Sequence, residues 1–238
     1  MRAERSDGSE HAARAAPAPR YGVLADTIPI DHEIEIRRSR FICRLQRVED
    51  EAEARDVIAG RRTAHRLARH HCSAFVLGAG RTVQRSNDDG EPAGTAGTPM
   101  LEAVVLHERD GVGAADVSDV VAVVTRYFGG VLLGAGGLAR AYSESVSSTL
   151  QLARLVTREA RAVFGLDAPH ATAGRWENEL RARGILVSGA DYVGTSAMLS
   201  LAVPDSVDAR ARLYSEVAAV TAGQGSLVEL GTEWVDLA

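Results

Sequence analysis

The chain has 238 residues, of which 45% are hydrophobic and 25% are charged, an ordinary globular composition. No apolar run approaches the roughly 18 residues that a membrane-spanning helix needs, so we expect no membrane partner. The net charge is -5, every basic residue is arginine, and this balance excludes a domain that is basic overall and coats duplex phosphate.

Residues 1–20 differ in composition from the rest of the chain. They contain no Val, Ile, Leu or aromatic residue, so they cannot bury enough apolar surface to offset the entropy of ordering, and we predict a disordered tail. The tail lacks the apolar stretch of a secretory signal. The chain has only two cysteines, Cys43 and Cys72, too few for a disulfide framework. We therefore expect a cytoplasmic location.

Residues 21–156 are predicted to form the first domain. Ile34 and Ile36 alternate with charged residues, which predicts a half-buried strand, and the alternation returns over residues 40–48. Residues 49–67 are predicted to form a helix. Acidic residues stand in its first turn and arginines in its last, as the helix dipole favours. Further along, the pattern predicts a strand at 72–77, a helix at 95–107, a strand at 117–125 and a helix at 135–155.

The order of predicted strands and helices changes at residues 157–238, and we place the domain boundary near Val156. A strand at 158–166 is followed by a helix that Asp167 and Pro169 open and Gly184 ends. Strands are predicted at 185–193, 195–203 and 226–235, with a helix capped by Asp205 before the last of them. The order βαββαβ predicts a ferredoxin-like domain. The fold class of the whole chain is therefore predicted to be α+β.

The first unusual segment, residues 86–101, combines carboxylates with glycines. A helix is expected to begin near Thr95 or Thr98, and its free amides could bind an anion. The carboxylates could hold a hard cation or an arginine-rich partner. The favoured alternative is an acidic turn that caps the helix, because no full set of metal ligands is visible. The candidate ligand-binding residues here are Asp88, Asp89, Gly90, Glu91, Thr95 and Gly97.

In the second unusual segment, residues 125–142, a buried strand leads through a glycine-rich loop into a helix. Its amides could face phosphate, with Arg126 and Arg140 as cationic partners. Tyr127 and Phe128 could stack on bases or could belong to the core, since adjacent strand residues point to opposite faces. The candidates here are Thr125, Arg126, Tyr127, Phe128, Gly129, Gly130, Gly134, Gly136, Gly137, Arg140 and Tyr142.

Neither segment predicts a catalytic set, a metal site or a cofactor. The glycines at 134–137 come too late after the strand for a dinucleotide-binding fingerprint, and without lysine there is no P-loop. His70, His71 and Cys72 suggest a metal, but neighbouring strand residues point apart, so a structural role is favoured.

Four runs of residues resemble the YigZ/IMPACT family. They are Ser39-Arg40-Phe41-Ile42, His70-His71-Cys72, the acidic and glycine-rich run at 88–99, and the run Val124 to Tyr142. The resemblance covers most of residues 21–155. Two positions depart from the family pattern: Leu132 and Thr98 stand where members often carry lysine, which removes charge beside the proposed anion site.

The resemblance implies a first domain with the ribosomal-protein domain 2-like fold, shared with elongation factor G domain IV. It implies a second domain like elongation factor G domain V. Eukaryotic members look like translational regulators that act through protein partners. The leading hypothesis is thus a non-catalytic, translation-associated protein that binds RNA, the ribosome or a regulatory protein. Two alternatives stay open: a metal-assisted enzyme acting on a phosphorylated small molecule or nucleotide, and a pure protein-interaction module.

Overall fold

The computed structural model describes residues 20–109 and 111–237, and no helix in this part is long and apolar enough to cross a membrane. The predicted tail lies outside the described residues except for Arg20, which begins the first strand. The chain forms two units, Arg20–Glu159 with Val235–Ala238, and Ala160–Trp234. The division after Glu159 lies three residues beyond the expected boundary at Val156.

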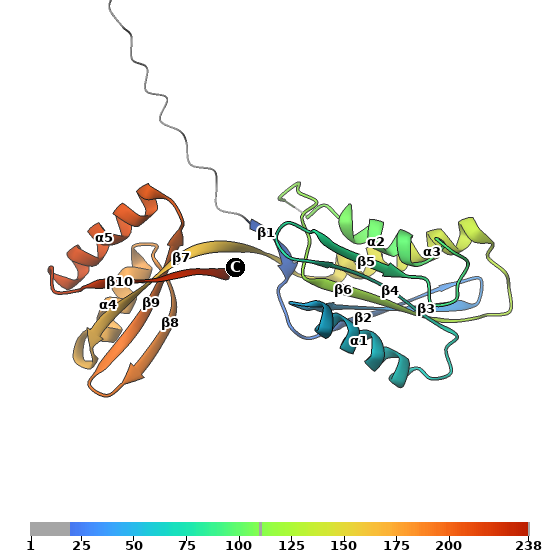
Figure 1. The fold of residues 1–238 in the computed structure, drawn as a ribbon, viewed down its shortest axis with the longest axis horizontal. Coiled ribbons are helices and arrows are strands. Elements are labelled where there is room, and N and C mark those ends of the chain that lie inside the picture. Colours follow the sequence, from blue (N-terminus) through green and yellow to red (C-terminus); the bar gives the residue numbers. More distant parts are fainter. Residues whose placement is uncertain (1–19, 110, 238) are drawn as a thin grey trace, which may run out of the picture. The chain divides into compact units, whose positions relative to one another are not determined.

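The first unit is built on a sheet in the order β2-β3-β6-β4-β5 (Figure 1). Its strands are β2 (Ile30–Ile36), β3 (Ser39–Arg47), β4 (His70–Leu77), β5 (Val83–Asn87) and β6 (Val120–Tyr127), and its helices are α1 (Glu51–Ala64), α2 (Gly97–Val105) and α3 (Ala135–Leu152). Alternate residues of the central strands face opposite sides. One side packs against α1 and the other against α2 and α3.

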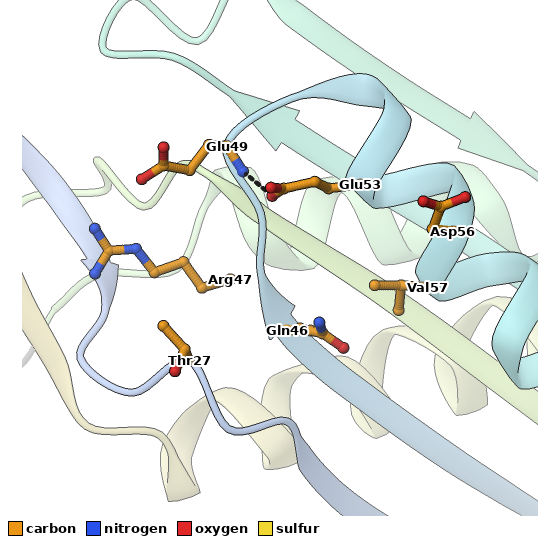
Figure 2. Close-up of a pocket in the computed structure, with 7 residues that line it drawn as sticks. All are labelled: Thr27, Gln46, Arg47, Glu49, Glu53, Asp56 and Val57. Carbon is orange, nitrogen blue, oxygen red and sulfur yellow. Dashed lines mark hydrogen bonds between the residues drawn. The ribbon is translucent and has the colours of Figure 1, made fainter.

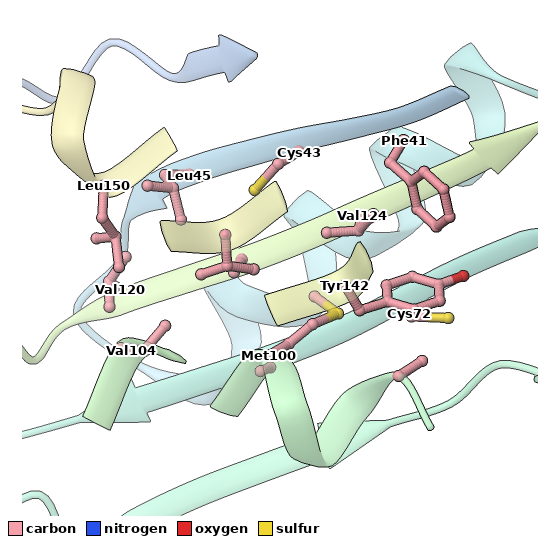
Figure 3. Close-up of a cluster of buried hydrophobic side chains, with 14 of the residues drawn as sticks. Phe41, Cys43, Leu45, Cys72, Met100, Val104, Val120, Val124, Tyr142 and Leu150 are labelled. Atoms are coloured by element: carbon pink, nitrogen blue, oxygen red, sulfur yellow. The ribbon is translucent and has the colours of Figure 1, made fainter. Parts of the chain in front are cut away.

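The larger core of this unit lies between the sheet and the pair α2 and α3 (Figure 3). Phe41 of β3 and Tyr142 of α3 meet edge to face, with 5.2 Å between their ring centroids. Met100 and Val104 enter the same layer from α2. The alternation over residues 40–48 predicted β3 correctly, because one face of that strand is buried and the other is partly exposed.

Two strands of this unit were not predicted from the sequence. In β1 (Arg20–Leu24) four consecutive residues are buried, so the strand shows no alternation, and its pairing partner lies more than 130 residues away in β7. In β5 almost every residue is polar and exposed, because the strand forms the edge of the sheet. Neither the buried strand nor the polar edge strand carries the period-two pattern on which the prediction relied.

The second unit has the predicted βαββαβ order. Its elements are β7 (Leu155–Pro169), α4 (His170–Ala182), β8 (Leu186–Val193), β9 (Ser196–Pro204), α5 (Val207–Thr221) and β10 (Leu227–Leu237). The strand order β10-β7-β9-β8 is that of a ferredoxin-like sheet. One cap was assigned to the wrong residue: Ser206 caps α5 by accepting from the Ala209 amide, whereas Asp205 pairs with Arg210.

Candidate ligand-binding site

The structure brings the two unusual segments together around one cavity of about 380 Å³ in the first unit. Glu91 and Pro92 come from the first segment, and Arg126, Phe128 and Gly134 come from the second. The antiparallel register explains this, because the end of β6 lies beside the start of β4, with Arg126 opposite His70. The remaining lining residues are Arg69, His70, Leu132, Leu133, Ala135 and Leu138.

A buried ion pair joins the two segments beside this cavity. The Arg126 guanidinium donates to Oε1 of Glu91 at 2.6 Å, and the Tyr142 hydroxyl donates to the same oxygen at 2.8 Å. Burial raises the pKa of the Tyr142 hydroxyl, which therefore remains a proton donor. Arg126 was expected to face a phosphate, but its charge is balanced by Glu91 inside the protein.

Asp88 caps the start of α2, in agreement with the favoured prediction of an acidic turn that caps this helix. Its carboxylate accepts hydrogen bonds from the amides of Gly94, Ala96 and Gly97 at 2.8–3.0 Å. The helix has no capping side chain of its own, and Thr95 is buried and donates to the Pro92 carbonyl. Asp88 thus supplies the negative charge that this helix start attracts.

Asp89 holds the turn to the neighbouring elements. Its carboxylate accepts from the His71 amide and from Arg62 of α1, both at 2.6 Å. Its carbonyl lies 2.9 Å from Nδ1 of His70. The three acidic side chains of the segment are therefore directed to protein donors. Among the described residues no group of three or more His, Cys, Asp or Glu side chains is placed to hold a metal ion.

We expect Asp88→Ala to lower the free energy of unfolding by about 0.5–2 kcal/mol, the usual range for losing a helix cap. Burial opposes ionisation of Asp88, but the amides of Gly94, Gly97 and Ala96 outweigh it and lower the pKa of the carboxyl. A lowered folded-state pKa gives stability that is present above the unfolded value, about 3.9, and is lost as pH falls through the folded pKa.

Urea denaturation between pH 7 and pH 3 measures this effect. The stability gap between the wild type and Asp88→Ala should narrow at the acid end. Glu102→Ala, which removes an exposed carboxylate from the same helix, should change stability little at any pH. A gap that stays constant down to pH 3 would contradict the role given to the ionised carboxylate.

Tyr127 and Phe128 of the second segment point to opposite sides of the sheet. The Tyr127 hydroxyl lies 3.0 Å from Nδ1 of His65, and the ring is half-buried. Phe128 lines the cavity and is 44% exposed, with the Arg126 guanidinium 5.7 Å from its ring centroid. Phe128 is therefore the aromatic of this pair that leaves a face open to a ligand.

The glycines of the second segment serve different purposes. A Cβ on Gly129 would stand 2.0 Å from the backbone of Arg38, so only glycine fits there. Gly130 and Gly134 have φ of 84° and 70°, which favours glycine. Gly136 would meet nothing within 4 Å, and Gly137 would meet only the Leu133 side chain at 3.1 Å. Close packing against Arg38 therefore explains why glycine is needed at position 129, whereas a side chain would fit at position 136.

The positions and contacts of the remaining candidate residues are also defined by the structure. Gly90 has φ of 86° and lies beside the His70 ring. A Cβ on Gly97 would stand 2.7 Å from the Asn87 amide nitrogen, so the start of α2 packs closely on β5. Thr125 is buried, with its hydroxyl 3.2 Å from Nδ1 of His71. Arg140 is exposed in the second turn of α3.

Exposed arginines gather at the same end of the unit, where the 37–38 turn, the 65–69 loop and the 128–134 loop lie together at the right of Figure 1. We call this surface the arginine end, and its members are Arg37, Arg38, Arg66, Arg69 and Arg140. In the part of the chain that the structure describes, none of them pairs with a carboxylate. Four of the five were not singled out from the sequence.

The signal for two of these residues was present in the sequence. Arg37 and Arg38 separate two strands that alternate in polarity, which marks them as a two-residue hairpin turn. They adopt φ of 47° and 65°. Both side chains are exposed, as expected for a turn between two strands. By contrast, grouping Arg66, Arg69 and Arg140 with them requires knowledge of the fold.

A second cavity, of about 460 Å³, lies where β3 leads into α1 (Figure 2). Glu49, Glu53 and Asp56 give it an acidic lining, and the Glu53 carboxylate accepts from the Glu49 amide. Its one basic residue, Arg47, pairs with Asp236. None of its lining residues belongs to either unusual segment, so we do not include it in the candidate site.

The chain is similar to known proteins over much of its length. A family model described as the Impact N-terminal domain matches residues 37–150. IMPACT family member YvyE of Bacillus subtilis is 47% identical over 162 residues, 68% of this chain and 71% of that protein. IMPACT family member YigZ of Escherichia coli is 41% identical over 130 residues, 54% of this chain and 60% of that protein.

A solved structure supports the two-domain α+β arrangement. It is described as the crystal structure of a hypothetical protein, with a TM-score of 0.55 and 31% identity, and the match covers 88% of this chain and 97% of that one. Identity of nearly half over more than two thirds of the B. subtilis protein, together with the family model, shows that the chain belongs to the IMPACT family.

Proposed function

We propose that the chain is a non-catalytic binding protein of the translation apparatus that holds single-stranded RNA at the arginine end. The observation that carries this proposal is the group of five exposed arginines that pair with no carboxylate of the described residues, together with the exposed ring of Phe128. Arginine side chains track the phosphate backbone of a single strand, and an exposed aromatic ring stacks on a base.

The start of α3 supports the same proposal. No acidic residue stands in its first turn and no side chain caps it, in contrast to α2, where Asp88 takes that place. Its free amides and positive dipole end face the loop that carries Phe128. Membership of the IMPACT family supports the association with translation. The metal-assisted enzyme is less favoured, because Asp88, Asp89 and Glu91 already bind protein donors.

We expect binding of a short RNA to weaken steeply with salt. With three to five phosphate contacts, the logarithm of affinity should fall with the logarithm of salt concentration at a slope of roughly -2 to -3.5. Arg69→Ala and Arg140→Ala should each reduce the slope by about 0.7, because each removes one contact. Fluorescence anisotropy with a labelled ten-nucleotide RNA over a salt series measures these slopes.

Arg175→Ala is the matched control, since Arg175 is an exposed arginine of α4 paired with Glu179. It should leave the slope unchanged. Arg126→Ala should lower stability rather than the slope, because that arginine is buried with Glu91. No binding at low salt by the folded wild type, or equal effects of Arg175→Ala and Arg69→Ala, would refute the proposal.

We expect Phe128→Ala to weaken RNA binding by about 1–3 kcal/mol while leaving the salt slope unchanged, because stacking involves no phosphate. The melting temperature should change little, since the ring is 44% exposed. Tyr127→Phe, which removes only the hydroxyl beside His65, should leave RNA affinity intact. A large loss of melting temperature in Phe128→Ala would instead assign the ring to the core.

A further inference from the structure

The second unit has one face of its sheet that its own helices do not cover. Its core contains Phe164 and Leu166 of β7 and Leu199 and Leu201 of β9, which pack with residues of α4 and α5. Because side chains alternate along a strand, the residues between them face away from the helices. We call this side the open face, and it exposes Asp167, Asp191, Met198, Val228 and Leu230.

The strand register places these residues in rows. Met198 is paired with Asp167 on one side and with Asp191 on the other, so the methionine stands between two carboxylates. Directly opposite residues of an antiparallel pair have Cβ atoms about 4.5–5.5 Å apart. In the next row Ser200 stands between Gly165 and Gly189, and the side chains of Met198 and Leu230 lie over Gly165.

Strand β10 adds apolar surface beside Gly165. Leu230 lies 3.4 Å from the position that a Cβ on Gly165 would take, which places it on the open face. Val228 shares that side, since Leu227 packs into the core and Glu229 pairs with Arg210 of α5. Met198, Val228 and Leu230 are 38%, 57% and 53% exposed, an unusual degree for apolar residues gathered on one face. The exposed area ends where Val163 and Ala202, the following pair, are buried.

Charge is divided unequally between the two sides of this unit. Arginines of the helical side are balanced locally, as in the pairs Arg175–Glu179, Arg181–Glu177, Arg183–Glu216 and Arg210–Glu229. Asp167 and Asp191 have no cationic partner among the described residues. Arg161 also belongs to β7, but it pairs opposite Pro204, three rows away from Asp167. The open face thus carries exposed apolar side chains from β9 and β10, with the carboxylates of Asp167 and Asp191 on either side of Met198.

We propose that the open face docks a basic amphipathic helix of a partner protein. The apolar stripe of such a helix would cover Met198 and Leu230, and its flanking arginine or lysine side chains would reach Asp167 and Asp191. Because Gly165 has no side chain, Met198 and Leu230 both lie over it and present their apolar groups to the partner. Charge complementarity selects this occupant, and it disfavours RNA, because two free carboxylates on the surface would repel phosphate.

The test uses the full chain labelled with ¹⁵N and a synthetic 18-residue amphipathic helix, with leucines on one face and arginines on either side of them. We expect the largest amide shifts at Met198, Ser200 and Leu230. Asp167→Asn combined with Asp191→Asn should raise Kd about two- to tenfold, as two exposed ion pairs allow. Met198→Lys, which places a cation at the centre, should raise Kd at least tenfold.

Asp208→Asn is the matched control, because it removes an exposed carboxylate from the helical side of the same unit. It should leave Kd unchanged, and a peptide with glutamate in place of every arginine should not bind. Thermal melts identify any variant that is misfolded. The proposal fails if the shifts fall on the helices, if Asp208→Asn weakens binding equally, or if a ten-nucleotide RNA gives the same shifts on the open face.

This inference is independent of the proposed RNA site. Arg69→Ala and Arg140→Ala belong to the first unit and should leave peptide binding unchanged, whereas Met198→Lys should leave the RNA salt slope unchanged. The experiments can therefore refute one of the two proposals without refuting the other.

Discussion

Glu91→Ala is expected to lower the free energy of unfolding by about 3–5 kcal/mol, because it leaves the Arg126 guanidinium buried without its counter-charge. Both side chains are less than 10% exposed, and the same carboxylate oxygen also accepts the Tyr142 hydroxyl. Chemical denaturation followed by circular dichroism gives the value. A loss of this size would unfold a marginally stable domain at physiological temperature.

A double-mutant cycle measures the interaction energy between Glu91 and Arg126 apart from their other contacts. Arg126→Met with Glu91→Leu should be more stable than either single change, because neither charge is then left alone. An exposed pair gives the contrast: Glu179→Ala breaks the surface pair with Arg175 and should cost less than about 0.5 kcal/mol. Strict additivity of the two core changes would show that Glu91 and Arg126 do not depend on each other.

Gly129→Ala is expected to destabilise the first unit by roughly 1–3 kcal/mol or more, because the new methyl group would overlap the backbone of Arg38. The turn between β2 and β3 would have to move, and with it the Ser39 hydroxyl, which accepts from the Gly129 amide at 3.2 Å. Thermal and urea unfolding measure the loss. RNA affinity should also fall, since Arg37 and Arg38 belong to the same turn.

Gly136→Ala is the matched change in the same glycine-rich segment. Nothing lies within 4 Å of its Cβ position, and the residue is in the first turn of α3. Alanine there should raise stability by about 0.4–1 kcal/mol through the unfolded state. Equal losses from both changes would mean that the loop tolerates no side chain at all, and the contact with Arg38 would then not explain Gly129.

The fold was largely predictable because most of its elements repeat a clear local pattern. Residues 40–48 alternate between buried and exposed, and the helix at 135–155 places Leu138, Tyr142, Val146 and Leu150 on one face, all of which are buried. The strands β1 and β5 were missed because their identity depends on distant pairing and on position at a sheet edge. Such information is not local.

The two segments that form the candidate site could be recognised in the sequence, but the pairing of their charges could not. Glycines and charged residues at the ends of elements indicated that residues 88–97 and 126–140 contain ligand-binding candidates. Glu91 and Arg126 from these segments line one cavity. The acidic turn that caps α2 was predicted, but the sequence could not show that Glu91 and Arg126 neutralise each other. Which charged groups pair with one another depends on the fold, so the grouping of exposed arginines at one end of the first unit could not be predicted.

The turn at Arg37 and Arg38 also bears on the balance between folding and binding. Both residues hold a left-handed backbone conformation, which costs an ordinary side chain about 1–2 kcal/mol and costs glycine little. Asparagine followed by glycine would form the same hairpin more stably. A chain carrying that pair would gain thermal resistance and lose two cations from the arginine end. The protein therefore retains a less stable turn where two exposed arginines of the arginine end stand.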